Sequence, residues 1–269
     1  RTPVQLDSLS EIPPLLGDKG ISSVLLVADA GVRALGLTRG LEEQLSQVGI
    51  RCGVYEQATP NPTISDVETA RAVYLKHGAQ AILAVGGGSA MDCAKVVGAR
   101  IARPKKPIQR MKGLLKVLTP TPLLIAVPTT AGTGSEVTLA AVITDGVKHH
   151  KYPINDFRLI PDYAVLDAKL TLGLPPLLTA TTGMDALTHA VEAYIGGSTT
   201  KFTRAMSAET VQRIFRCLET AVADGRNEPA RQEMLRAAFC AGAAFTRSYV
   251  GYVHGIAHSL GGKYGIAHG

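Results

Sequence analysis

The chain has little cysteine and no closely spaced cysteine pair. Its four cysteines, Cys52, Cys93, Cys217 and Cys240, lie far apart and form no C-x-x-C motif. This spacing argues against both a disulfide framework and a zinc knuckle. Thiols that are not paired in the sequence are typical of a reducing compartment, so we expect a cytoplasmic protein.

Long apolar runs and aromatic clusters are also missing. No apolar run approaches the length of a membrane span, so we expect no membrane-embedded segment. The lysines and arginines behind the net charge of +6 are dispersed, and the few aromatic residues, 5% of the chain, are not interleaved with them. A solvated basic face is therefore a better interpretation than a nucleic-acid groove, and attraction of a phosphorylated cofactor is the alternative.

The first half of the chain alternates strand-like and helix-like patterns. The predicted strands begin the stretches 22–30, 51–58, 79–89 and 121–138, of which the third runs into glycines and the fourth ends in a loop of small polar residues. The predicted helices cover residues 36–49, 64–78 and 89–102, and the second of them has Ser65 or Asp66 as its expected cap. Repeated strand, helix and strand of this length predict a parallel α/β sheet with right-handed crossovers.

The pattern changes near Leu170, where long helical segments replace the strands. We therefore divide the chain into a dinucleotide-binding, Rossmann-like α/β domain at residues 1–172 and an all-α domain at residues 173–269. The chain begins at Arg1 and stops at Gly269, and both ends look like cuts in a longer protein. We expect the helical domain to be incomplete.

Histidines gather at the end of the sequence, where GYVHGIAHSLGGKYGIAHG contains His254, His258 and His268. Upstream, His189 follows Asp185 by four residues, which places both on one helix face. A carboxylate and up to three imidazoles suit a divalent metal. A pair of histidines four residues apart, such as His254 and His258, is more often an ordinary pair on a helix surface or in a core than a metal site. Glycines at 251, 255, 261, 262 and 265 favour a site, because they let the backbone approach a ligand.

Two loops of small residues follow predicted strands and offer anion contacts. Gly86, Gly87 and Gly88 precede a helix that starts near Ser89, and backbone N–H groups at such a turn favour phosphate. Tight packing of strand and helix explains the glycines equally well. The second loop, at residues 129–135, offers hydroxyls and N–H groups to phosphate or ribose. The alternative explanation of this loop is the start of a helix that is capped by Ser135. Together the loops favour a dinucleotide.

Asp29 stands at the end of the first predicted strand. An acid in this position accepts hydrogen bonds from ribose hydroxyls and repels the extra phosphate of NADP, so it would select NAD. An aspartate in a surface turn is the commoner explanation for a single example.

Four motifs together resemble the iron-containing (group III) alcohol dehydrogenase family. They are GGGSAMDCAK at 86–95, PTTAGTGSEVT at 128–138, GMDALTHAVEAY at 183–194 and the ending GYVHGIAHSLGG…HG. The resemblance covers nearly the whole chain, and it is to the alcohol dehydrogenase branch rather than the maleylacetate reductase or glycerol dehydrogenase branch. It implies an NAD(P)-binding α/β domain, a helical domain and a divalent metal between them.

The resemblance also implies roles for individual residues. The implied metal ligands are Asp185, His189, His254 and His268. The implied catalytic residue is His258, as a proton relay beside the nicotinamide. The positions implied to line the cofactor cleft are Asp29, Asn61, Gly87, Gly88, Ser89, Thr129, Thr130, Thr138 and Lys151.

The implied activity is metal-dependent hydride transfer between a primary alcohol or aldehyde and NAD, with iron as the metal and zinc as its alternative. We expect a small-molecule substrate, no nucleic-acid or membrane partner, and a homo-oligomer such as a dimer. Two alternatives stay open. One is a related metal- and NAD-dependent enzyme, such as a hydroxyacid–oxoacid transhydrogenase or a lyase-type synthase. The other is a truncated relative that binds a nucleotide without turnover.

Overall fold

The computed structural model describes residues 2–146, 150–264 and 268, so Gly265 and Gly269 of the glycine-rich ending lie outside it. Contacts within the chain group it into two compact units. The first unit comprises residues 1–129 and 139–166, and the second comprises residues 130–138 and 167–269. The second unit thus takes in a short loop from the first half of the sequence. Our division into domains after residue 172 stays a prediction.

A parallel sheet of six strands forms the centre of the first unit, in the order β1-β9-β6-β4-β2-β3. The strands are β1 (Val4–Leu6), β2 (Ser23–Ala28), β3 (Arg51–Tyr55), β4 (Ala81–Gly86), β6 (Leu123–Pro128) and β9 (Tyr163–Val165). Every residue of β2 and β4 is buried. Such continuous apolar strands are typical of a parallel sheet covered on both faces, and the predicted parallel α/β sheet is confirmed.

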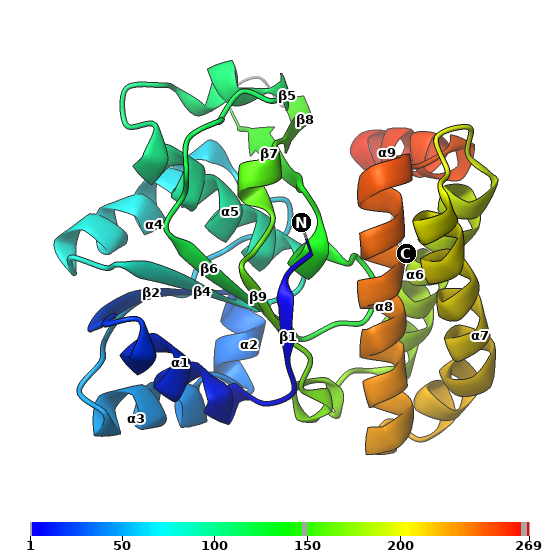
Figure 1. The fold of residues 1–269 in the computed structure, drawn as a ribbon, viewed down its shortest axis with the longest axis horizontal. Coiled ribbons are helices and arrows are strands. Elements are labelled where there is room, and N and C mark those ends of the chain that lie inside the picture. The colour runs from blue at the N-terminus through cyan, green and yellow to red at the C-terminus, as the bar shows by residue number, and fades with distance from the viewer. Residues whose placement is uncertain (1, 147–149, 265–267, 269) are drawn as a thin grey trace. The chain divides into compact units, whose positions relative to one another are not determined.

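Helices cover both faces of this sheet, with α4 and α5 on one side and α1, α2 and α3 on the other (Figure 1). Their bounds are α1 Ile12–Asp18, α2 Ala30–Ala34, α3 Arg39–Gln47, α4 Ile64–Lys76 and α5 Gly88–Ala102. The predicted cap of α4 is wrong, because Thr63 takes that position. The Thr63 hydroxyl accepts from the Asp66 N–H, and the Asp66 carboxylate accepts from the Thr63 N–H. Asp66 therefore belongs to the first turn of the helix, as the second member of a capping box.

A second sheet of three strands was not predicted. It consists of β5 (Gly113–Leu114), β8 (His150–Asn155) and β7 (Ala140–Asp145), in that order, and β7 and β8 are antiparallel. β7 alternates between fully and partly buried residues, and β8 contains Pro153 and begins with two exposed residues. Neither strand therefore shows the continuous apolar run that predicts β2, β4 and β6 of the large sheet, and the three-residue strands β1 and β9 of that sheet were not predicted either.

The second unit is helical, as predicted, and its described part contains no strand. Its long helices are α6 (Pro176–Ile195), α7 (Lys201–Ala223), α8 (Glu228–Ser248) and α9 (Tyr252–Tyr264). The first three run side by side (Figure 1). Side-chain caps at Thr200 and Asn227 fix where α7 and α8 begin. None of the helices in the described part of the chain combines the length and apolarity that crossing a membrane requires.

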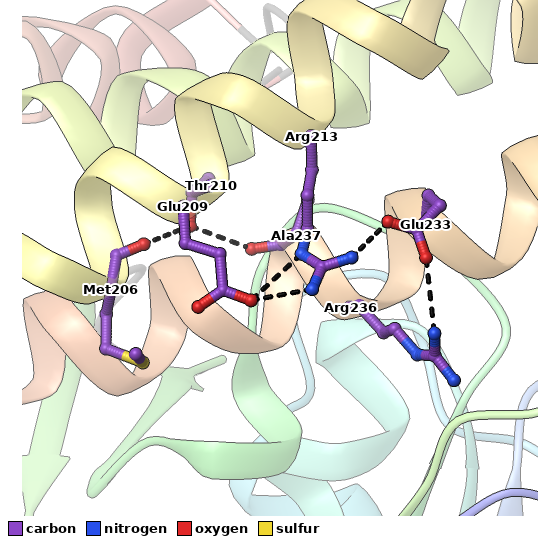
Figure 2. Close-up of polar contacts among 7 residues, drawn as sticks. All are labelled: Met206, Glu209, Thr210, Arg213, Glu233, Arg236 and Ala237. Carbon is purple, nitrogen blue, oxygen red and sulfur yellow. Dashed lines mark hydrogen bonds and ion pairs between the residues drawn. The ribbon is translucent and has the colours of Figure 1, made fainter.

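An ion-pair network joins α7 to α8 (Figure 2). Arg213 of α7 donates to Glu209 on its own helix at 2.6 Å and also pairs with Glu233 of α8. Beside it, the buried Thr210 hydroxyl donates to the carbonyl oxygen of Ala237 at 3.2 Å. The carboxylates are partly exposed, so the ion pairs contribute little to stability compared with the apolar packing of the two helices.

Glycines let the loop at residues 130–138 contact the second unit's helices through its backbone. A Cβ atom on Gly242 of α8 would lie 2.5 Å from Val137 Cγ1 and 2.8 Å from the carbonyl oxygen of Gly134. Gly134 itself has a φ of +62°, in the left-handed region that favours glycine. The loop and α8 therefore lie so close together that no residue with a side chain fits at position 242 without a shift of the loop or the helix.

We expect the substitution Gly242→Ala to lower the free energy of unfolding by about 1–3 kcal/mol, since overpacking at this contact forces the loop away from α8. Gly40→Ala is the matched control, because Gly40 lies in α3 with open space around it. That control should stabilise the protein by roughly 0.5–1 kcal/mol. Denaturant unfolding of both variants measures the difference, and equal midpoints would contradict this account of Gly242.

Candidate functional site

One face of α6 carries the acidic and imidazole groups of the candidate metal site. Asp185, His189 and Glu192 follow at intervals of four and three residues, so their side chains leave the helix in the same direction. All three are buried, with exposed fractions of 7%, 5% and 6%. The predicted shared face of Asp185 and His189 is confirmed, whereas Glu192 was not singled out in the sequence.

The Asp185 carboxylate lies at the centre of a group of imidazoles. Its Oδ1 atom is 3.9 Å from His189 Nδ1, 3.5 Å from His254 Nε2 and 3.7 Å from His268 Nε2. Most of these distances are too long for good hydrogen bonds. Two ligands of one tetrahedral metal ion, each about 2.1 Å from it, lie about 3.4 Å apart. The spacing of these atoms therefore fits ligands that share an ion.

An unsatisfied atom supports the same interpretation. His189 Nδ1 is buried and makes no hydrogen bond with any residue that the structure describes. The ring is held between Phe245 of α8, at 4.1 Å between ring centroids, and His254, at 4.2 Å. Leaving a buried polar atom without a partner costs about 1–3 kcal/mol, and a metal ion would satisfy it.

The protonation states also suit a metal. Burial lowers the pKa of His189 to about 4, which keeps the ring neutral and a nitrogen lone pair available. Burial acts to raise the pKa of Asp185, but the hydrogen bond from His254 and the neighbouring imidazoles outweigh it, so this pKa is lowered. A carboxylate and a neutral imidazole are the forms that bind metals. Oxygen and nitrogen ligands without thiolates suit iron or zinc, so these residues fit a divalent ion.

His254 begins the contribution of α9 to the site. The ring is buried and its Nδ1 lies 2.6 Å from Glu192 Oε2, with Nε2 towards Asp185. Burial works against protonation, but the carboxylates of Asp185 and Glu192 prevail and raise the pKa of His254. A proton and a metal ion would therefore compete for this ring.

His258 and His268 complete the imidazole group. The two rings stack with centroids 4.8 Å apart, and the His268 ring lies 5.5 Å from that of His254. Both residues are exposed. The structure thus brings together all four predicted metal ligands, and it places the predicted proton relay next to one of them.

The first unit gathers most of the predicted cofactor positions at the carboxyl edge of its large sheet. Asp29 follows β2, Gly87 and Gly88 follow β4, and Thr129 follows β6, and these strands are neighbours. Gly87 is the N-cap of α5 and has no side chain to cap it. Free N–H groups at such a helix start attract phosphate.

Two residues at this edge also have structural roles. A Cβ atom on Gly86 would lie 2.8 Å from the Ala90 side chain, so tight packing of strand and helix explains this glycine. Asp29 Oδ1 accepts from the Val32 N–H at 2.8 Å and caps α2.

Lys151, another of the predicted cofactor positions, lies on β8 of the small sheet in the first unit. Lys151 Nζ donates to Asn61 Oδ1 at 2.5 Å, and the Asn61 N–H donates to Ser89 Oγ at 3.3 Å. Burial lowers the pKa of Lys151, although the charge of Asp92 opposes this. Thr130 and Thr138 belong to the second unit, where Thr138 is buried at the end of the short 3-10 helix Ser135–Val137.

The first unit is a parallel α/β unit with a glycine turn at the carboxyl edge of its large sheet. The second is a helical unit with a cluster of candidate metal ligands. Together they indicate a metal-dependent protein of the nucleotide-binding type. Comparison with protein families names the family. The model for "Iron-containing alcohol dehydrogenase" matches residues 3–168, and that for "Fe-containing alcohol dehydrogenase family, C-terminal" matches residues 179–269. The chain belongs to the iron-containing alcohol dehydrogenase family.

Individual relatives agree with this assignment. The chain is 40% identical to alcohol dehydrogenase 4 of Schizosaccharomyces pombe, over 97% of this chain and 62% of the relative. It is 39% identical to the 1,3-propanediol dehydrogenase of Klebsiella pneumoniae, over 99% of this chain and 68% of the relative. A solved structure of sulfoacetaldehyde reductase from Bifidobacterium kashiwanohense with NAD+ is 30% identical, with a TM-score of 0.91 over 100% of this chain and 72% of that one. The chain thus spans between 62% and 72% of the length of these relatives.

We expect a divalent metal to stabilise the helical unit by satisfying His189 Nδ1. At a free Co²⁺ concentration 100 times the dissociation constant, the gain in free energy of unfolding should be about 2.7 kcal/mol. Asp185→Asn should abolish that gain, because it removes the central charge. Asp224→Asn, in the exposed turn after α7, is the matched control and should keep it. Thermal unfolding with and without Co²⁺ measures the effect, and an equal gain in the Asp185 variant would refute the site.

Proposed function

We propose that this chain carries the metal and cofactor sites of an NAD-dependent, iron-type alcohol dehydrogenase that interconverts primary alcohols and aldehydes. The main observation that supports this proposal is that Asp185 Oδ1 lies within 3.9 Å of a nitrogen atom of each of three histidines. The names of the relatives, an alcohol dehydrogenase and a 1,3-propanediol dehydrogenase, support the choice of substrate class.

In this proposal Asp185, His189, His254 and His268 hold the metal. When bound, the metal supplies a Lewis acid that acidifies the alcohol, and the nicotinamide supplies the acceptor for its hydride. Iron is the proposed ion on the basis of family membership, and the same ligands would accept zinc. The role of the protein is to fix the ligands and keep Asp185 ionised and His189 neutral.

His258 is the proposed proton relay. It follows His254 by one turn of α9, it is exposed, and its ring stacks on that of His268. An imidazole in this position can take the proton of the alcohol and pass it to solvent.

The proposed cofactor contacts are Asp29, Asn61, Gly87, Gly88, Ser89, Thr129, Thr130, Thr138 and Lys151. Support comes from the shared sheet edge, from the Lys151–Asn61–Ser89 hydrogen bonds and from a relative solved with NAD+. We further propose a homo-oligomer, for which the edge strand β1 offers a surface, and a cytoplasmic location, with which four free cysteines agree.

Replacement of His268 by alanine tests the metal assignment. The exposed ring contributes little to folding, so the variant should lose bound iron or zinc and alcohol-dependent NADH formation, and it should still bind NADH. His77→Ala, at the end of α4, is the control and should keep its metal. Elemental analysis of protein purified without air and NADH fluorescence titration give the two readouts. Full metal content in the His268 variant would overturn the ligand assignment.

The same preparations distinguish the related activities. A simple dehydrogenase forms NADH from NAD and a primary alcohol or diol in a fixed ratio to aldehyde. A transhydrogenase exchanges hydroxyacid and oxoacid without net NADH, and that result would replace the proposal.

Asp29→Asn tests the choice of cofactor. Asparagine caps a helix about as well as aspartate, so α2 should stay intact while the negative charge is lost. We expect the wild type to prefer NAD to NADP and the variant to narrow that preference by roughly tenfold, or about 1.4 kcal/mol. Dissociation constants for NADH and NADPH measure the ratio. A wild type that prefers NADP would show that Asp29 does not select the cofactor.

A further inference from the structure

Glu192 is the buried carboxylate of the α6 face that is not among the proposed metal ligands. We propose that it is the positioning residue of the metal site: it orients His254 and ties the start of α9 to α6, without itself binding the ion. This inference rests on the proposed metal site.

Three N–H groups converge on the Glu192 carboxylate. Oε2 accepts from the Gly251 N–H at 2.7 Å and lies 2.6 Å from His254 Nδ1. Oε1 accepts from the Val253 N–H at 2.7 Å. Both oxygens therefore accept hydrogen bonds from the protein. The Glu192 carboxylate contacts Nδ1 of His254, whereas Nε2 of the same ring is the atom near Asp185.

These contacts fix which nitrogen of His254 is available. An ionised carboxylate only accepts hydrogen bonds, so Nδ1 must carry the proton. In the neutral ring the lone pair is then on Nε2, which is the atom 3.5 Å from Asp185 Oδ1. A carboxylate behind a metal-binding histidine fixes its tautomer and ring orientation in this way.

The backbone contacts add a second effect. Gly251 immediately precedes α9 and Val253 lies in its first turn, where N–H groups have no partner within the helix. A carboxylate at this end is also favoured by the helix dipole. Because Glu192 is on α6, it holds the helix that carries His254 in register with the helix that carries Asp185 and His189.

Gly251 provides room for this arrangement. A Cβ atom there would lie 2.8 Å from Glu192 Oε1 and 3.0 Å from its Cδ atom. The substitution Gly251→Ala would therefore push the carboxylate aside without changing its charge. Gly255, one turn further along α9, has nothing within 4 Å of its added Cβ atom and offers a matched control.

The test uses Co²⁺ as a probe ion in metal-free protein. Its affinity is measured by competition with a chromophoric chelator, and its visible spectrum reports the number and geometry of the ligands. Four variants are compared with the wild type. They are Glu192→Gln and Gly251→Ala, with Glu219→Gln at an exposed position of α7 and Gly255→Ala as their controls.

Glu192→Gln keeps the size of the side chain but replaces one acceptor oxygen by an NH₂ group, which cannot accept from the backbone N–H groups. We expect the dissociation constant of Co²⁺ to rise about 10- to 100-fold, with a changed visible spectrum as His254 loses its orientation. Gly251→Ala should shift both readouts in the same direction by up to about tenfold. The two controls should match the wild type.

The outcomes separate this inference from the proposed function. If the wild type and both controls bind Co²⁺ tightly and Glu192→Gln binds it equally well with the same spectrum, the role of Glu192 is refuted and the metal site stands. A lower melting temperature with unchanged affinity and spectrum would likewise reduce Glu192 to a structural anchor. If the wild type itself binds no Co²⁺, the proposed metal site and this inference are both refuted.

Discussion

The close approach of the Asp185 carboxylate to the imidazoles of α6, α9 and the chain end is the constraint on which the helical unit depends. It places a carboxylate and the two imidazoles of His189 and His254 in a buried position, where His189 Nδ1 has no hydrogen-bond partner among the described residues. Burial of such groups without compensation is unfavourable, and here only part of the compensation comes from the protein. A bound ion would supply the rest, and metal binding would then be coupled to the folding of this unit.

The helix α6 satisfies this constraint through its periodicity. Residues 185, 189 and 192 share one face, and that face receives Phe245 from α8 and His254 from α9. The partners come from distant parts of the sequence, so the site forms only when α6, α8 and α9 are packed. The first unit works differently, because its candidate contacts are backbone turns at the ends of neighbouring parallel strands, and these are fixed by local strand–helix connections.

This contrast explains how much the sequence could predict. The buried strands β2, β4 and β6 are continuous apolar runs and the helices α6 to α8 are long, so the sequence predicts all of them. β1 and β9 have only three residues each, and β7 and β8 alternate without a continuous apolar run, so a local pattern could not reveal them. The candidate ligands His254 and His268 are visible as histidines near glycines, and Asp185 and His189 as a pair on one helix face, while the family resemblance implies their role. Glu192 was overlooked, although its place three residues after His189 on the same face was a usable signal.

The glycines show why the rest needs the structure. In the sequence, the glycine-rich ending was interpreted as room for backbone to approach a ligand. At Gly251 the group that approaches is instead the Glu192 carboxylate, which leaves no space for a Cβ atom, whereas Gly255 has open space around it. Residues that look equivalent in a motif therefore differ in what they permit. Glycine stands at position 251 because the buried Glu192 carboxylate must reach the start of α9. Glu192 lies on α6, about 60 residues earlier in the chain, so the sequence around Gly251 does not show this need.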